Sequence, residues 1–126
     1  MTVLDELSRS RYVSLTTYRK NGTGVATPVW HAVDGGELFL STTPDSWKVK
    51  RIRKDARVVV AVCGPRGHIV EGAPSAEGTA RILDAAGTDN VRRLLARKYL
   101  TVRLTLLLRR VLGLKQRPAV AIAVSF

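Results

Sequence analysis

The chain has 126 residues, enough for one hydrophobic core and too few for two, so we expect a single domain spanning residues 1–126. A hydrophobic fraction of 45% and a charged fraction of 25% are ordinary for a folded globular protein and exclude intrinsic disorder. The formal net charge of +11 favours anionic partners, and no acidic residue follows Asp89.

The first predicted elements are a short helix and a β-rich region. Thr2 and Asp5 form a capping signal ahead of a helical apolar face. Residues 11–42 contain β-rich runs separated by Asn-Gly and Asp-Gly-Gly, which supply the positive φ angles of tight hairpins and predict a three-stranded meander. Pro28 lies inside the second run, where it cannot donate a ladder hydrogen bond, so we expect an edge strand or a bulge there.

A basic helix and further strands are predicted in the middle of the chain. Asp45 or Ser46 can accept hydrogen bonds from free helix amides, and Val49 and Ile52 fall on the inward side of a helix from about Ser46 to Lys54. β-branched runs and turn residues then predict strands at 56–63, 68–73 and 76–84.

The last third of the chain predicts two helical segments and a final strand. Thr88 is expected to cap a helix that begins at Asp89, and the closing residues 117–126 are typical of a buried strand. The whole order predicts a mainly β fold, a small barrel of six to seven antiparallel strands with short peripheral helices. Apolar residues also recur at three- and four-residue steps with arginines at their margins, at Leu100, Leu104, Leu107, Leu108 and Val111.

This apolar stripe has three interpretations. We favour contact with the core or with a second subunit. An apolar helical face flanked by Arg103, Arg109 and Arg110 also suits weak association with an anionic membrane surface. The same arginines are alternatively expected to meet an acidic cofactor tail. No apolar run approaches the roughly 18 residues of a spanning helix, so no transmembrane segment is predicted.

Six cations lie within the ten residues 48–57, between two predicted strands. A helix N-terminus offers unpaired N–H groups and a partial positive charge, both suited to phosphate. A solvated helix face and a nucleic-acid surface are the alternatives, although no aromatic stacking signature supports specific RNA recognition. In a phosphate site, the side chains expected to converge are Thr42, Thr43, Ser46 and Lys48, with Lys50 and Arg51 within a turn.

Two segments resemble a known family. LFLSTTPDSWKVKRIRKDARVVV resembles the flavin-binding core of the pyridoxamine 5′-phosphate oxidase-like split β-barrels, also called FMN-binding-like, and ATPVWHAVDGGELFL is similar to the branch that uses the deazaflavin F420. The resemblance covers about residues 8–83 and is weaker in the C-terminal third. The positions that match the phosphate-site motif are Thr42, Ser46, Lys48 and Ile52.

The sequence also departs from the family motif. Trp47 replaces an arginine that contacts phosphate, and Thr43 replaces an asparagine. Lys50 or Arg51 is available to supply the missing phosphate contact. Because the surplus of cations suits the oligoglutamate tail of F420, we favour F420 over FMN as the cofactor.

The resemblance implies a homodimer with cofactor sites at the subunit interface, where Ser46 and Lys48 hold the phosphate. It implies an F420-dependent oxidoreductase that passes a hydride to a small conjugated acceptor. An FMN-binding oxidoreductase, a non-catalytic F420 carrier and a basic nucleic-acid-associated protein remain alternatives. The predicted cofactor-binding residues are Pro28, Val29, Trp30, Thr42, Thr43, Ser46, Trp47, Lys48, Lys50 and Arg51.

The remaining chemically active residues form no recognisable catalytic or metal-binding motif, so the catalytic side chain, if any, is unknown and no metal is expected. Trp30 and His31 alternate along a strand, so only one can face a given pocket. His68 is expected to be exposed. Cys63, the one cysteine, is expected to be buried, and together with the acidic N-terminal segment it predicts a cytoplasmic protein.

Overall fold

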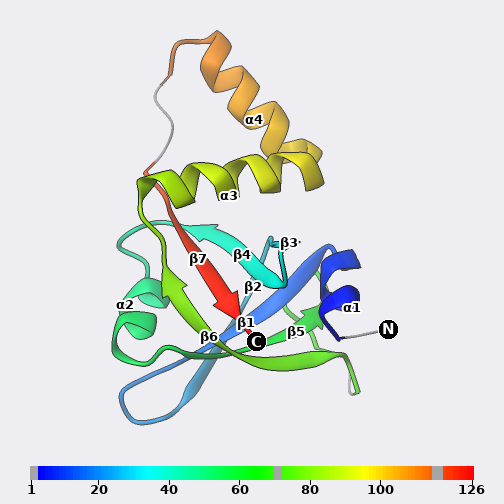
Figure 1. Ribbon diagram of the computed structural model, residues 1–126, viewed down its shortest axis with the longest axis vertical. Coiled ribbons are helices and arrows are strands. Elements are labelled where there is room, and N and C mark those ends of the chain that lie inside the picture. Colours follow the sequence, from blue (N-terminus) through cyan, green and yellow to red (C-terminus); the bar gives the residue numbers. More distant parts are fainter. Residues whose placement is uncertain (1–2, 70–71, 115–117) are drawn as a thin grey trace.

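The computed structural model describes residues 3–69, 72–114 and 118–126. Its seven strands form one antiparallel sheet in the order β2-β1-β5-β6-β7-β4-β3. This curled half-barrel confirms the predicted mainly β split-barrel class (Figure 1). The strands are β1 (Tyr12–Tyr18), β2 (Gly24–Val29), β3 (Ala32–Asp34), β4 (Glu37–Thr42), β5 (Arg57–Cys63), β6 (Ser75–Ile82) and β7 (Val120–Ser125).

The two ends of the sheet are formed by strands that are consecutive in the sequence. β2 pairs with β1 and β3 pairs with β4, so the predicted three-stranded meander is wrong. Trp30 and His31 separate β2 from β3 and lead the chain from one end of the sheet to the other. Pro28 lies in β2, an end strand, which confirms the edge position inferred from its missing N–H group.

The core lies inside the curled sheet and is built from alternating strand positions. Leu15 of β1, Leu40 of β4 and Val60 of β5 are fully buried, as the period of two along a strand requires. Helix α1 (Val3–Arg9) contributes Leu7 to the same cluster, and the expected Thr2 cap lies outside the described residues.

Helix α2 (Trp47–Lys54) connects β4 to β5 and begins as predicted. Ser46 is the N-cap, and its Oγ accepts a hydrogen bond from the Val49 amide at 3.4 Å. Val49 and Ile52 are buried against the barrel. The basic side chains are therefore distributed around the rest of the helix.

Helices α3 (Ala85–Lys98) and α4 (Leu100–Val111) lie together at one end of the barrel (Figure 1). The N-cap of α3 is Asp84, whose carboxylate accepts from the Gly87 amide at 2.8 Å, so the predicted cap at Thr88 is wrong. α3 contacts β3, β4 and β7, and its apolar face joins a second cluster that includes Tyr99 and Ala121.

Three other expectations require correction. In the predicted strand 68–73, the described residues 68, 69, 72 and 73 are not in a strand, and residues 70 and 71 lie outside the described part of the chain. The apolar stripe of α4 does not enter the core, because α4 contains no buried residue. His68 is exposed as predicted, whereas Cys63 is only partly buried, and this burial raises its pKa.

Candidate functional site

Helix α2 separates the predicted cofactor residues between two cavities, each of about 740 Å³. We call the cavity on the side of β2 and β4 the strand cleft and the other the basic pocket. From the barrel, the strand cleft is lined by Pro28, Val29, Trp30, Ser41, Thr42, Thr43 and Lys48. From the C-terminal third, it is lined by Arg92, Leu95, Val102, Thr105, Leu106, Arg109, Pro118 and Ala119.

The strand cleft combines an apolar wall with hydroxyls and cations. Pro28, Val29 and Leu106 are among its apolar lining residues, while Thr42 and Lys48 supply polar groups. None of its fifteen lining residues is acidic. This composition suits a ligand with a flat, weakly polar part and an anionic group.

Trp30 is held in the cleft by a stacked aromatic pair. Its ring centroid lies 5.0 Å from that of Tyr99, with 13° between the ring planes. The Tyr99 hydroxyl donates to the Arg11 carbonyl at 2.7 Å and accepts from the His31 amide at 3.1 Å. The orientation of Trp30 is therefore fixed through contacts with both the barrel and α3.

His31 belongs to a different environment from its neighbour Trp30, in agreement with the predicted alternation. It is completely buried and is absent from the cleft lining, and its Nε2 hydrogen-bonds to the Leu7 carbonyl. Burial is the main cause that lowers the pKa of His31 to about 4. A neutral, enclosed imidazole of this kind connects structural elements and does not reach the cleft.

Lys48 is the cation that α2 contributes to the strand cleft. Burial, followed by the nearby Arg51 charge, lowers the pKa of its ammonium group. Both effects make the positive charge of Lys48 less favourable, and an anion held beside the ammonium group would oppose them. Thr42 and Thr43 line the same cavity, whereas the Ser46 hydroxyl is engaged in capping α2.

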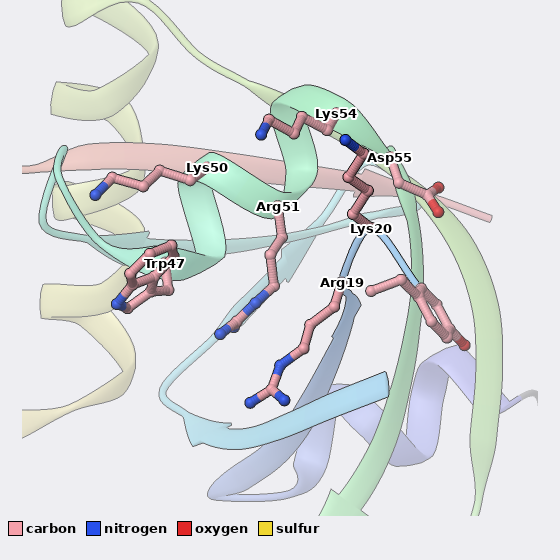
Figure 2. Close-up of a pocket in the computed structure, with 8 residues that line it drawn as sticks. Arg19, Lys20, Trp47, Lys50, Arg51, Lys54 and Asp55 are labelled. Carbon is pink, nitrogen blue, oxygen red and sulfur yellow. The ribbon is translucent and has the colours of Figure 1, made fainter. Parts of the chain in front are cut away.

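The basic pocket contains the other predicted α2 residues. Trp47 is 68% exposed, and the Lys50 Nζ lies 4.5 Å from its ring centroid. Figure 2 shows Trp47, Arg51 and Arg19 on the same side of α2, with both guanidinium groups directed away from the helix. Sequence reasoning missed the hairpin contribution to this cavity, whose lining is Tyr18, Arg19, Lys20, Trp47, Lys50, Arg51, Lys54 and Asp55.

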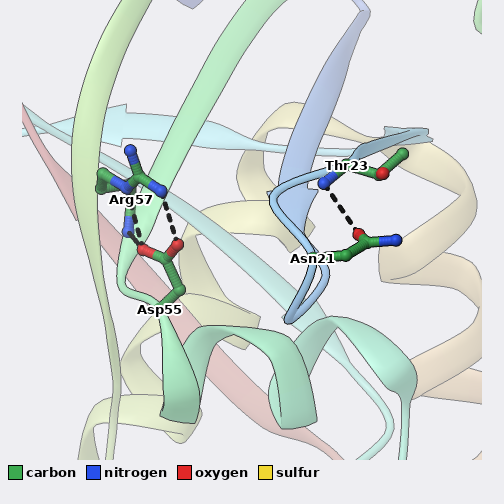
Figure 3. Close-up of polar contacts among 4 residues, drawn as sticks. All are labelled: Asn21, Thr23, Asp55 and Arg57. Carbon is green, nitrogen blue, oxygen red and sulfur yellow. Dashed lines mark hydrogen bonds and ion pairs between the residues drawn. The ribbon is translucent and has the colours of Figure 1, made fainter.

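The acidic residue in the basic pocket is paired outside it. Asp55 accepts from the Arg57 guanidinium at 2.8 Å and 3.1 Å, and this pairing lowers the Asp55 pKa (Figure 3). The neighbouring hairpin is closed by the Thr23 amide, which donates to the Asn21 side chain at 3.0 Å (Figure 3). The cations of α2 and of this hairpin therefore line one cavity whose carboxylate is already engaged.

One of the three interpretations of the apolar stripe placed Arg109 beside an acidic cofactor tail, but sequence reasoning missed the apolar residues in this helix wall of the strand cleft. Val102, Leu106 and Arg109 lie at i, i+4 and i+7 on α4, a second helical face opposite the leucine stripe. This spacing was the sequence signal from which the apolar helix wall could have been predicted. Arg92 contributes a further cation from α3, where it also pairs with Asp89 at 3.6 Å.

The sheet is curled and antiparallel, α2 connects β4 to β5, and a cleft lies between that helix and the end strand β2. This arrangement defines the split β-barrel class. Residues 2–124 match the pyridoxamine 5′-phosphate oxidase family, and the chain belongs to it. No curated protein matches the sequence significantly.

Solved structures show the same fold at low sequence identity. An F420 reductase is 21% identical with a TM-score of 0.58, and the match covers 94% of this chain and 88% of that one. A conserved hypothetical protein of Mycobacterium tuberculosis is 23% identical (TM-score 0.71, 96% and 76% covered). The heme storage protein HutZ of Vibrio cholerae is 10% identical (TM-score 0.67, 99% and 90% covered).

Among the described residues, no helix is long and apolar enough to cross a membrane.

Proposed function

We propose that this protein is an F420-dependent oxidoreductase that binds the deazaflavin in the strand cleft. The observation that carries the proposal is the meeting of two separate segments in one cavity. Residues Pro28–Trp30, from the end strand β2 and the residue after it, line the same cleft as Thr42, Thr43 and Lys48. These are the segments in which the family resemblance places the cofactor ring and its phosphate.

The lining residues fit a ring that carries a phosphate. The apolar wall, with Trp30 held against Tyr99, provides a flat surface of fixed orientation. Lys48 is a partly buried cation in a cleft lined by no acidic residue, as a phosphate-binding group should be. Arg92 and Arg109 add positive charge on the opposite wall, which supports F420 and its acidic tail over FMN.

In this assignment the chain supplies binding and orientation. Lys48 and the threonine hydroxyls would hold the phosphate end, and Pro28, Val29 and Trp30 would fix the plane of the ring. F420 supplies the hydride when it is bound. Leu95, Val102 and Leu106 are apolar lining residues that would keep water from a bound ring, a condition that favours transfer to a conjugated acceptor held against it. The assembly we propose is the family's homodimer, with the partner subunit completing the acceptor side.

Cofactor binding is tested by a matched pair of lysines on α2. Lys48 lines the strand cleft and Lys50 the basic pocket, two residues further along the helix. In a fluorescence titration with F420, Lys48→Ala should weaken binding by about 1.5–3 kcal/mol through loss of a charge-assisted hydrogen bond. Lys50→Ala should change binding by less than about 0.5 kcal/mol.

If Lys50→Ala weakened F420 binding more than Lys48→Ala did, the cofactor would be assigned to the basic pocket instead. FMN that binds wild type as tightly as F420 does would contradict the cofactor assignment. Unchanged F420 binding in both variants would identify the lysines of α2 as a solvated surface. Steeply salt-dependent nucleic-acid binding that F420 fails to displace would favour the nucleic-acid alternative.

Catalysis is tested separately from binding. Stopped-flow absorbance should show faster loss of reduced F420 when an enone, a quinone or a tetrapyrrole-like acceptor is added to the protein. Lys48→Ala should slow this reaction at low concentrations of reduced F420. The rate should recover as reduced F420 approaches saturation. Tight F420 binding without acceleration by any acceptor in a broad panel would instead indicate a cofactor carrier.

A further inference from the structure

Helix α4 presents an uncovered apolar face. Five side chains on this face are each more than half exposed, and the patch continues past the helix end through Leu112 and Leu114. Successive helix residues rotate by about 100°, so the five fall within an arc of about 100°. They are Leu100, Leu104, Leu107, Leu108 and Val111, and we call them the leucine face.

The exposure of the leucine face follows from how α4 is held. Its opposite face, with Val102 and Leu106, forms part of the strand cleft, and Val102 also packs against the cluster around α3. Tyr99, the residue between the two helices, is buried and bound to the Arg11 carbonyl. The Arg103 guanidinium donates to the Ala96 carbonyl at 3.3 Å. These contacts fix α4, which lies with α3 at one end of the barrel (Figure 1), and they leave its leucine face exposed.

The charges around the leucine face are all of one sign. Arg103 and Arg110 lie on one margin of the apolar arc, and the threonines Thr101 and Thr105 lie on the other. After Asp89 the sequence contains nine Lys or Arg residues and no acid. The apolar patch is therefore bordered by cations that have no carboxylate in the same part of the chain to neutralise them.

We propose that the leucine face docks onto an anionic lipid surface, with α4 lying in the membrane interface. An apolar helical face bordered by arginines is the pattern of interfacial helices, in which leucines enter the acyl boundary and cations meet lipid phosphates. A second copy of this chain complements the face less well. If two α4 helices met antiparallel through their leucine faces, Arg103 and Arg110 would approach the partner's arginines with no acid from this segment between them.

Vesicle co-sedimentation tests the proposal with two compositions, pure phosphatidylcholine and phosphatidylcholine containing phosphatidylglycerol. Wild type should bind the anionic vesicles, and binding should weaken as NaCl is raised. Leu104→Gln combined with Leu108→Gln should reduce that binding on the order of tenfold or more, because two apolar side chains no longer enter the lipid. Both leucines are more than half exposed, so the fold should tolerate this change.

A charge-matched pair separates local contact from net charge. Arg110→Glu should weaken binding at least about fivefold more than Arg66→Glu, which changes the net charge equally in the exposed turn after β5. Light scattering follows the assembly mass of each variant in parallel. Absence of wild-type binding to anionic vesicles, equal binding to neutral ones, or a smaller assembly after the leucine substitutions would overturn the proposal, the last by identifying a contact between subunits.

Discussion

His31 is a buried histidine whose surroundings hold the imidazole neutral. The Nε2 atom hydrogen-bonds to the Leu7 carbonyl, and this requires the proton on that nitrogen. Lys98 approaches the same ring at 3.2 Å and donates to the Ser8 carbonyl at 2.9 Å, so a second positive charge on the imidazole would be repelled. Burial, which is the largest cause, and this repulsion lower the His31 pKa to about 4, although the hydrogen bond to Leu7 acts in the opposite direction and raises it. The cluster joins α1, the segment after β2 and α3.

The low pKa predicts a loss of stability in mild acid. Below pH 6.5 the unfolded chain protonates His31 while the folded protein does not, so the free energy of unfolding falls until the pH reaches about 4. Between pH 7 and pH 5, His31 should lower the free energy of unfolding by roughly 2 kcal/mol. Urea unfolding at the two pH values measures it.

Two glutamine variants isolate this effect. His31→Gln keeps a side-chain N–H for the Leu7 carbonyl but does not titrate, so it should be less stable than wild type at pH 7 and lose less on acidification. His68→Gln removes a histidine that is exposed and should retain the wild-type loss. An identical loss in wild type and His31→Gln would show that other groups cause the acid sensitivity.

At the scale of elements, Thr88 connects α3 to the sheet. The residue is buried in the first part of the helix, and its Oγ1 accepts from the Ala121 amide of β7 at 3.0 Å. The sequence suggested a helix cap because threonine is common at that position, but Asp84 performs the capping four residues earlier. The threonine instead satisfies a buried backbone donor, which ties the cleft-forming helix to the barrel.

Replacement of Thr88 should loosen this connection. Thr88→Val keeps the side-chain shape but leaves the Ala121 N–H buried without its acceptor, so we expect a loss of about 1–3 kcal/mol in the free energy of unfolding. Thr88→Ser keeps the hydroxyl and should lose less. Chemical denaturation of the two variants measures the difference, and equal losses would mean that packing, and not the hydrogen bond, holds α3 in place.

At the scale of the whole molecule, the positive charge is organised around two cavities and one helix. The strand cleft has three basic and no acidic lining residues, and the basic pocket has five basic residues with an acid already paired to Arg57. The net charge of +11 alone could not distinguish a nucleic-acid surface from a small-ligand site. The separation of Lys48 from Lys50 by the body of α2 makes these alternatives testable one residue at a time.

Local sequence patterns were sufficient to predict most of the helices and strands. Ser46 as a cap, the apolar pair Val49 and Ile52, and the Asn-Gly turn each act through neighbours a few residues away, so sequence spacing predicted α2 and the first hairpin. The mainly β class followed from the same short-range signals. The family resemblance added the expectation that Pro28–Trp30 and Lys48 share a site, and the structure brings them to one cleft.

The sequence by itself thus determined the β-rich class, the basic helix and its cap, because short-range sterics and hydrogen bonding decide them. Only the tertiary structure decided that β2 and β3 lie at opposite ends of the sheet and that α2 divides its cations between two cavities. It also decided that the leucine face of α4 remains outside the core. Helical periodicity shows that an apolar face exists, but what covers that face depends on which elements the curled sheet leaves within reach.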